Sequence, residues 1–219
     1  MVQPSSHSPY SQRLSLISHP QACPVLFLIT DCPDQDALEN DYLPTLRAHD
    51  CVNLVRLCDP NAYDPAVLKG NGVAVWDWFF EDGSIPPDTI ITSFRNLVDS
   101  LISNPSSSSH PALALHCVSG VGRAPVLVTC ALIDGGMDPI EAVELVRSKR
   151  RGCLNKKQLA WLLDSKKGFK PLKRGKRKPV ASSGPANGGK VTNMGSSGAT
   201  LDADASKKKM FGGLFGRKK

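Results

Sequence analysis

Apolar and polar residues follow regular patterns between about Pro24 and Leu163. Short apolar runs there are typical of buried strands, and longer segments with apolar side chains at helical spacing are typical of amphipathic helices. The sequence predicts strands over residues 24–30, 51–58, 72–76 and 112–116, and helices over residues 34–47, 88–103, 123–133, 140–147 and about 156–164. This alternation predicts an α/β domain with a central, mostly parallel sheet of about four to five strands flanked by helices.

The two ends of the chain differ from this central part. Residues 1–22 are rich in Ser, Pro, Gln and His, and residues 169–219 are rich in Gly, Ser, Lys and Ala without hydrophobic periodicity. Such compositions are typical of disorder. We therefore expect a folded domain over residues 23–168, between a disordered N-terminal segment (1–22) and a disordered basic C-terminal tail (169–219).

The positive charge of the chain is concentrated in that tail. The formal net charge is +7, but residues 170–219 alone hold 13 basic and two acidic residues. The rest of the chain is therefore mildly acidic. Charge confined to one segment is weak evidence for nucleic-acid binding by the domain, so no specific nucleic-acid partner is expected.

The cysteines and the hydropathy indicate a reducing, cytoplasmic setting. Seven cysteines is an odd number, and they show neither CxxC pairs nor metal-ligand spacing. No secretory signal precedes them, and no apolar stretch is long enough to span a membrane. We expect no disulfide framework and no metal site.

The segment from His116 to Arg123 carries the candidate chemistry, because it lies between a predicted strand and a predicted helix. A cysteine at a helix N-terminus, here Cys117, is held as a nucleophilic thiolate. Backbone amides of the loop can bind phosphoryl oxygens, and Arg123 can bind phosphate bidentately and stabilise transition-state charge. His116 can orient the loop. The predicted phosphate-binding residues are Val118, Ser119, Gly120, Val121, Gly122 and Arg123.

Cleavage of a phosphate ester also needs an acid that protonates the leaving oxygen. The acidic loop around residues 77–83 offers Asp77, Glu81 and Asp82. Asp82 is preferred, because the glycine that follows it suits a mobile loop that closes over the substrate. The alternative is that this loop is simply a solvated acidic surface. For Cys117, the alternative of a buried cysteine in a glycine turn is disfavoured by the agreement of glycines, arginine and predicted elements.

These residues resemble a known family. Residues 116–123 match the HCxxGxxR signature of the protein tyrosine phosphatase superfamily, and residues 116–128 resemble the phosphatases of regenerating liver, the type IVA tyrosine phosphatases. Residues 54–58, 77–83 and 149–158 agree with the same family in the same order. The resemblance covers roughly residues 25–163.

The resemblance implies hydrolysis of phosphate monoesters on phosphotyrosine and phosphoserine or phosphothreonine proteins, through a cysteinyl-phosphate intermediate and without a cofactor. It implies Cys117 as nucleophile, Arg123 as phosphate binder and Asp82 as general acid. It also implies that Cys58 pairs with Cys117 in a reversible, silencing disulfide. A purely structural, buried Cys58 is the alternative. Ala124 stands where most of the superfamily has Ser or Thr, which implies slow turnover.

Two departures from the family stand out. Phe79 replaces the proline of the family's acid loop, and the chain ends without the family's prenylation motif, so prenyl anchoring is not expected. The family also binds cyclin-M-type magnesium transporters, with an arginine that corresponds to Arg151 at the contact. A largely non-catalytic binding module for a transporter's cytosolic domain is therefore one alternative function. A phosphoinositide phosphatase is another, weakened by the absence of lysines within the loop.

The tail contains two basic clusters, residues 173–178 and 207–219, and the second also holds Met, Phe and Leu side chains. Basic and aromatic residues together favour binding to an anionic membrane surface. Nuclear import, RNA contact and a solvated tail are the alternatives. The expected location is the cytoplasm, with a fraction at membranes or in the nucleus left open.

Overall fold

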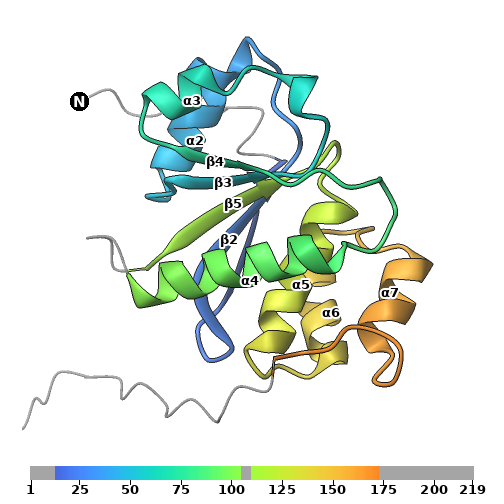
Figure 1. Cartoon of the computed structure of the whole chain (residues 1–219). Helices are drawn as coiled ribbons and strands as arrows, with labels where there is room; N and C mark the ends of the chain where they lie inside the picture. Colours follow the sequence, from blue (N-terminus) through green and yellow to red (C-terminus); the bar gives the residue numbers. More distant parts are fainter. Residues whose placement is uncertain (1–12, 105–109, 173–219) are drawn as a thin grey trace, which may run out of the picture. The chain divides into compact units, whose positions relative to one another are not determined.

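The computed structural model describes residues 13–104 and 110–172 and contains a five-stranded sheet (Figure 1). The strands lie in the order β1-β2-β5-β3-β4, with β1 antiparallel to β2 and the other pairs parallel. Their bounds are β1 (Ser15–His19), β2 (Cys23–Thr30), β3 (Asn53–Arg56), β4 (Ala74–Asp77) and β5 (Ala112–His116). The mostly parallel α/β sheet predicted from the sequence is confirmed.

The central strand β5 is buried along its whole length. It is parallel to both of its neighbours, β2 and β3. A parallel strand with helices on both faces needs apolar side chains on both sides, which is why ALALH shows no polar alternation. Consecutive residues accordingly enter opposite cores: Leu113 packs in one hydrophobic cluster and Ala114 in the other.

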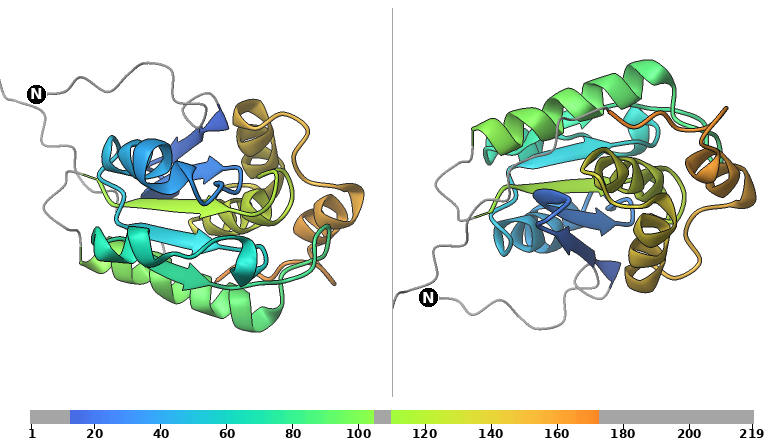
Figure 2. Two further views of the ribbon diagram at one scale, coloured as in Figure 1. Left: turned by 90° about the horizontal axis from the view of Figure 1, so that it is seen from above. Right: turned by 90° about the horizontal axis from the view of Figure 1, so that it is seen from below.

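Helices cover both faces of this sheet (Figures 1 and 2). One face carries α4 (Asp88–Ser103), α5 (Arg123–Asp134), α6 (Pro139–Lys149) and α7 (Lys156–Leu163); the other carries η1 (Leu38–Tyr42), α2 (Leu43–Arg47) and α3 (Ala66–Gly70), with the short η2 (Pro60–Ala62) nearby. The helix predicted over residues 34–47 is divided, because η1 is a π-helical turn and Pro44 stands in the first turn of α2. The short α3 was not predicted.

The predicted domain boundaries are wrong at both ends. Strand β1 lies inside the segment expected to be disordered, and its alternating burial places Ile17 in the core while β2 binds its backbone. At the other end, Phe169 is buried, and its ring lies edge-on to Trp161 at 5.3 Å between centroids. Both short segments gain their order from contacts with distant residues. Residues 1–12 and 173–219, with the basic clusters of the tail, lie outside the described residues.

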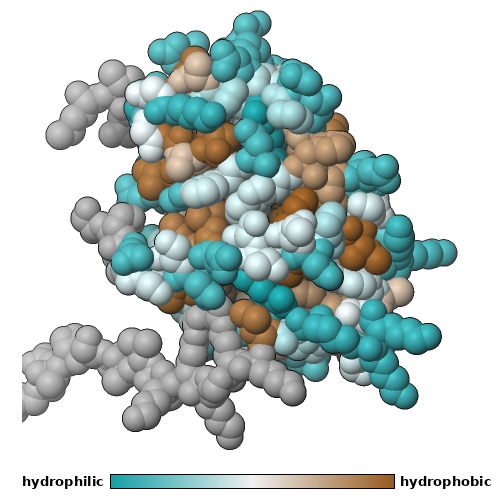
Figure 3. Space-filling model, viewed as in Figure 1, coloured by the Kyte–Doolittle hydropathy of each residue, from teal (hydrophilic) through white to brown (hydrophobic). Residues whose placement is uncertain are grey.

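The surface in Figure 3 shows hydrophobic residues in separate patches among hydrophilic ones. Within residues 13–104 and 110–172, no helix is long and apolar enough to cross a membrane.

Candidate active site

The carboxyl ends of β2, β3 and β5 meet at one edge of the sheet, and the candidate residues follow these strand ends. The Cys32 N–H donates to the carbonyl of Val118 at 2.8 Å, and the Leu57 N–H donates to the carbonyl of His116 at 3.0 Å. These bonds fix the segments after β2 and β3 against the segment after β5. Ligand sites of open α/β sheets form at this edge.

Residues 117–122, here called the phosphate loop, connect β5 to the N-terminus of α5. The Cys117 side chain is buried, whereas Val118 and Val121 are exposed at the rim of the loop. Gly120 has a φ of +63°, and a Cβ there would lie 2.6 Å from the carbonyl oxygen of Thr30. Both the backbone angle and the space therefore require glycine at this position.

Arg123 begins α5 and is held from two sides while one nitrogen stays free of hydrogen bonds. Its Nη1 donates to the carbonyls of Leu57 at 2.9 Å and Phe80 at 3.1 Å. Its Nε is buried without a hydrogen-bond partner in the described part of the chain, and lies 3.3 Å from the carboxylate of Asp82. A buried guanidinium nitrogen without an acceptor costs free energy, so this position is suited to an anionic oxygen.

The three candidate acids lie in different environments. Asp77 is bound by Nε of Arg56 at 2.5 Å, in a pair that also involves the ring of Tyr63, 4.6 Å from the Arg56 guanidinium. Asp77 is therefore part of the sheet edge. Glu81 is exposed. Asp82 is the acid whose carboxylate lies beside Arg123, and its side chain is 74% exposed.

The N-terminus of α7 holds the acid loop in place. Nδ2 of Asn155 donates to the carbonyl of Gly83 at 2.9 Å, and Nε2 of Gln158 donates to the carbonyl of Ser84 at 3.1 Å. These two residues also form the capping box of the helix, and Gln158 is fully buried. The sequence analysis did not identify them, although the Asn-x-x-Gln spacing before an apolar run is a capping signal.

His116 is buried behind the phosphate loop in a polar cluster. Its Nδ1 lies 3.1 Å from the Cys117 carbonyl and its Nε2 lies 2.7 Å from the Tyr63 hydroxyl. Because a carbonyl oxygen only accepts, Nδ1 carries a hydrogen. Cys58 Sγ lies 3.9 Å from the same nitrogen. His116 thus contacts the backbone at Cys117 from behind the loop.

Cys58 also contacts Cys32, with 3.7 Å between their sulfurs. The pKa of the Cys58 thiol is lowered, first by the hydrogen bond from Cys32 and then by His116, against the effect of burial. The pKa of the Cys32 thiol is raised by the same hydrogen bond and by burial. These directions make Cys32 the donor and Cys58 the acceptor of the hydrogen bond between them. None of the seven cysteines forms a disulfide.

The sulfurs of Cys32 and Cys58 and a ring nitrogen of His116 lie within 4.8 Å of one another, close enough for metal ligands. Nδ1 of His116, however, faces the sulfurs while it donates to the Cys117 carbonyl. A nitrogen that carries a hydrogen cannot bind a metal, so the contacts here are those of a hydrogen-bonded thiol pair.

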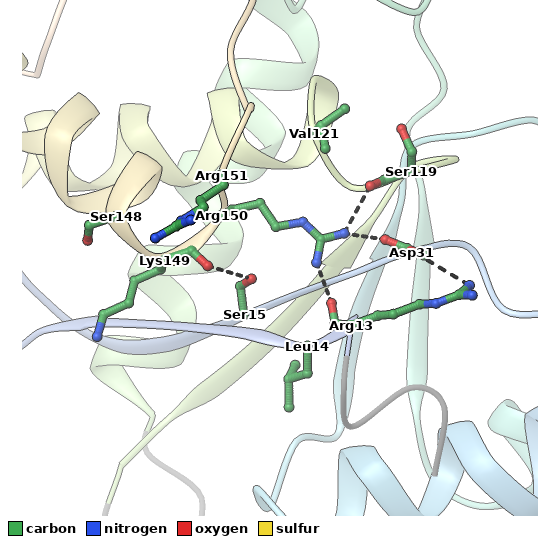
Figure 4. A pocket seen from close by; sticks show the side chains of 10 residues that line it. All are labelled: Arg13, Leu14, Ser15, Asp31, Ser119, Val121, Ser148, Lys149, Arg150 and Arg151. Carbon is green, nitrogen blue, oxygen red and sulfur yellow. Dashed lines mark hydrogen bonds and ion pairs between the residues drawn. The ribbon is translucent and has the colours of Figure 1, made fainter. Parts of the chain in front are cut away.

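A basic cavity of about 520 Å³ opens beside the phosphate loop (Figure 4). The guanidinium of Arg150 lies at its centre, paired with Asp31, and donates to the carbonyls of Ser119 at 2.9 Å and Gly120 at 3.3 Å. Arg150 thereby supports the loop from outside. The other lining residues are Arg13, Leu14, Ser15, Val121, Ser148, Lys149 and Arg151.

The structure thus brings most of the predicted site residues together. The phosphate loop, Arg123, Asp82 and His116 form one site. Cys58 lies behind it, in contact with Cys32 and His116. Arg151 lies on the adjoining cavity with its side chain exposed.

No protein-family model matches the chain. Individual relatives do. The chain is 42% identical over 140 residues to a type IVA A protein tyrosine phosphatase of Dictyostelium discoideum, and 42% identical over 153 residues to the PRL-1 phosphatase of Drosophila melanogaster; each match covers 81% of the relative. The matches to the Dictyostelium and Drosophila proteins cover 64% and 69% of this chain, respectively. It is also 42% identical over 136 residues to protein tyrosine phosphatase type IVA 2 of Mus musculus, covering 62% of this chain and 78% of that protein.

Solved structures agree with these relatives. A Leishmania major protein solved as a protein tyrosine phosphatase matches with a TM-score of 0.61 and 33% identity, over 70% of this chain and 98% of that one. Kinase associated phosphatase matches with a TM-score of 0.56 and 17% identity, over 72% of this chain and 94% of that one, which shows the shared fold alone.

Proposed function

We propose that Cys117, Arg123 and Asp82 are the catalytic residues of this chain, which belongs to the type IVA family of protein tyrosine phosphatases. The chain is a cysteine-dependent phosphatase that acts on phosphorylated proteins. The observation that carries the assignment of residues is the buried Nε of Arg123, which has a carboxylate 3.3 Å away and no hydrogen-bond partner among the residues that the structure describes.

In the first step, the Cys117 thiolate attacks phosphorus and the P–O bond to the substrate breaks. Cys117 begins the loop that leads into the N-terminus of α5, and the first amides of a helix carry partial positive charge that favours a bound anion. The amides of residues 118–122 and Nε of Arg123 bind the three remaining phosphoryl oxygens. The hydrogen bonds of Arg123 to Leu57 and Phe80 hold its guanidinium in place before substrate arrives.

Asp82 donates its proton to the leaving oxygen. Its exposed carboxylate lies at the mouth of the loop beside Arg123, where a leaving group would depart. Asn155 and Gln158 hold the carbonyls of Gly83 and Ser84, directly after Asp82 in the chain, and this limits the movement of the acid loop. This anchoring offsets the replacement of the family's proline by the exposed Phe79.

In the second step, water hydrolyses the cysteinyl phosphate and restores the Cys117 thiolate. Ala124 is fully buried in the first turn of α5 and supplies no hydroxyl to this step. The second step is therefore slow, and the phosphoenzyme accumulates.

Steady-state hydrolysis of an aryl phosphate tests the assignment of the nucleophile. Cys117→Ser abolishes turnover. Cys130→Ser, which changes a buried cysteine within α5, leaves turnover near that of the wild type. Equal loss in both variants, with both folded, would contradict the assignment.

Binding of a magnesium-transporter cytosolic domain is a second proposed function of the same face. It is supported by the position of the exposed Arg151 on a basic cavity that also contains Ser119 and Val121 of the phosphate loop. A partner seated there would cover the loop, so the transporter domain would inhibit hydrolysis competitively. Arg151→Ala should weaken the inhibition without changing turnover of an aryl phosphate.

The finer substrate range and the location of the protein are also proposals. Phosphotyrosine and phosphoserine or phosphothreonine proteins are the proposed substrates, ahead of phosphoinositides, because the loop interior has no lysine. The tail is proposed to bring part of a cytoplasmic pool to anionic membranes. Deletion of residues 207–219 should release that fraction, and an unchanged distribution would contradict the proposal.

A further inference from the structure

Cys32 lies at a position from which it can react with Cys58. It is the second residue after β2, as Cys58 is the second residue after β3, and these two strands flank β5 on opposite sides. The two sulfurs are 3.7 Å apart, compared with about 2.0 Å in a disulfide. Movement of the two side chains by a total of about 1.7 Å would therefore close the bond.

Both residues are connected to the catalytic machinery without belonging to it. The Cys32 N–H donates to the carbonyl of Val118 in the phosphate loop. The residue before Cys58, Leu57, accepts a hydrogen bond from Arg123. A covalent bond between the two sulfurs would join the segments that support the loop and the arginine, while the thiol of Cys117 stays free.

The electrostatic environment separates the roles of the two sulfurs. Cys58 accepts hydrogen bonds from Cys32 and faces Nδ1 of His116, so its thiolate is stabilised. Cys32 keeps its proton and is partly exposed, whereas Cys58 is buried. A stabilised thiolate is the sulfur that a peroxide oxidises, and a neighbouring thiol resolves the product.

We propose that a disulfide between Cys32 and Cys58 is the stable end product when this protein is oxidised by a peroxide. The Cys58 thiolate attacks the distal oxygen of a hydroperoxide ROOH, the O–O bond breaks, and the OH group is transferred to sulfur, which gives Cys58 sulfenic acid and releases RO⁻. The Cys32 sulfur then attacks the Cys58 sulfur, the S–O bond breaks, and the oxygen leaves as water with the Cys32 proton.

The same bond also forms by exchange, a route that rests on the proposed redox role of Cys58 toward Cys117. If a Cys58–Cys117 disulfide forms, the Cys32 thiol loses its proton to solvent as its sulfur attacks Cys58, the Cys58–Cys117 bond breaks, and the Cys117 thiolate is released. Two electrons are transferred to the peroxide in either route, and the nucleophile ends reduced. Cys32 therefore protects Cys117 from being held in a disulfide.

Peptide mapping of the oxidised full-length chain tests this proposal. The reduced protein is treated with hydrogen peroxide, residual thiols are alkylated, and a non-reducing digest is analysed by mass spectrometry. We expect the Cys32 and Cys58 peptides linked, and the Cys117 peptide alkylated. Cys32→Ser should lose the linked pair completely, whereas Cys51→Ser, a change of a buried cysteine in the core cluster against which Cys32 packs, should retain it.

A Cys58–Cys117 linkage that persists in the wild type would overturn the proposal. So would an alkylated Cys32 alongside a Cys58 oxidised to sulfinic acid. Near-ultraviolet circular dichroism before oxidation verifies that Cys32→Ser is folded. Peptide mapping does not depend on phosphatase activity. Loss of the Cys32–Cys58 proposal would therefore leave the catalytic assignment intact, because turnover of Cys117→Ser tests that assignment separately.

Discussion

Replacement of Gly120 by alanine is expected to distort the phosphate loop, and the structure gives the size of the effect. The new Cβ would meet the carbonyl oxygen of Thr30 at 2.6 Å and Nη2 of Arg150 at 2.5 Å. The arginine can move, but the backbone carbonyl of β2 is held in the sheet. In addition, the φ of +63° places an alanine in the left-handed region.

The two costs have different sizes. The left-handed conformation costs an alanine about 1–2 kcal/mol, and a forced contact in a packed site costs about 1–3 kcal/mol more. The sum is a loss of about 2–5 kcal/mol in the free energy of unfolding. For a domain of this size, each kcal/mol lowers Tm by about 2–4 °C, so Gly120→Ala should unfold at least about 4 °C below the wild type.

Gly72→Ala is the matched control for this experiment. Gly72 also has a positive φ, +83°, but apart from its chain neighbours no described residue would lie within 4 Å of a Cβ there. Thermal unfolding followed by circular dichroism should show the smaller loss for Gly72→Ala. Aryl phosphate hydrolysis should fall in Gly120→Ala alone, because only that residue belongs to the phosphate loop. Equal Tm values with full activity in both variants would show that a Cβ at position 120 does not clash with the Thr30 carbonyl.

Three further changes give distinct results. Asp82→Asn should lower kcat for an aryl phosphate by about 10²-fold or more through loss of the general acid, while Asp77→Asn, which breaks the pair with Arg56, should mainly lower Tm. Arg150→Ala removes the bonds to two loop carbonyls and should lower both kcat/KM and Tm, with the exposed Arg151→Ala as control. The folded-state pKa of Cys58 lies below its ordinary value of 9.0, so its contribution to stability is complete above pH 9 and is lost as pH falls toward the folded pKa. Urea unfolding at pH 6 and pH 8 should therefore show a larger gain with pH for wild type than for Cys58→Ser, and equal gains would contradict the lowered pKa.

The sequence predicts those parts of the site that are contiguous in the chain. Cys117 and Arg123 lie six residues apart, and their chemistry is visible in one strand-loop-helix segment. Arg150, Gln158 and Cys32 reach the site from distant segments. Their roles depend on which loop the fold places beside them, and a periodic pattern contains no such information.

The errors at the ends of the domain have a similar cause. Strand β1 lies at the edge of the described sheet, where it pairs with β2, and it buries alternate residues, so its composition resembles that of a polar tail. Phe169 gains its burial from Trp161 and from Arg95, whose guanidinium lies 5.0 Å from the ring centroid. In contrast, the fully buried β5 and the amphipathic α4 have the bounds that their own patterns predict. The local sequence pattern predicts an element's bounds where most of its residues are buried. It fails where the burial of a short segment depends on a single neighbouring element.

Rapid-quench hydrolysis of an aryl phosphate by reduced full-length protein tests whether the reaction passes through a phosphoryl group on Cys117. We expect a burst near one equivalent of the aryl product, followed by slow turnover, with phosphate recovered on the Cys117 peptide. The burst should be absent in Cys117→Ser, and the slow phase should quicken in Ala124→Ser. Turnover without phosphate on Cys117, or a burst that survives Cys117→Ser, would exclude Cys117 as the nucleophile.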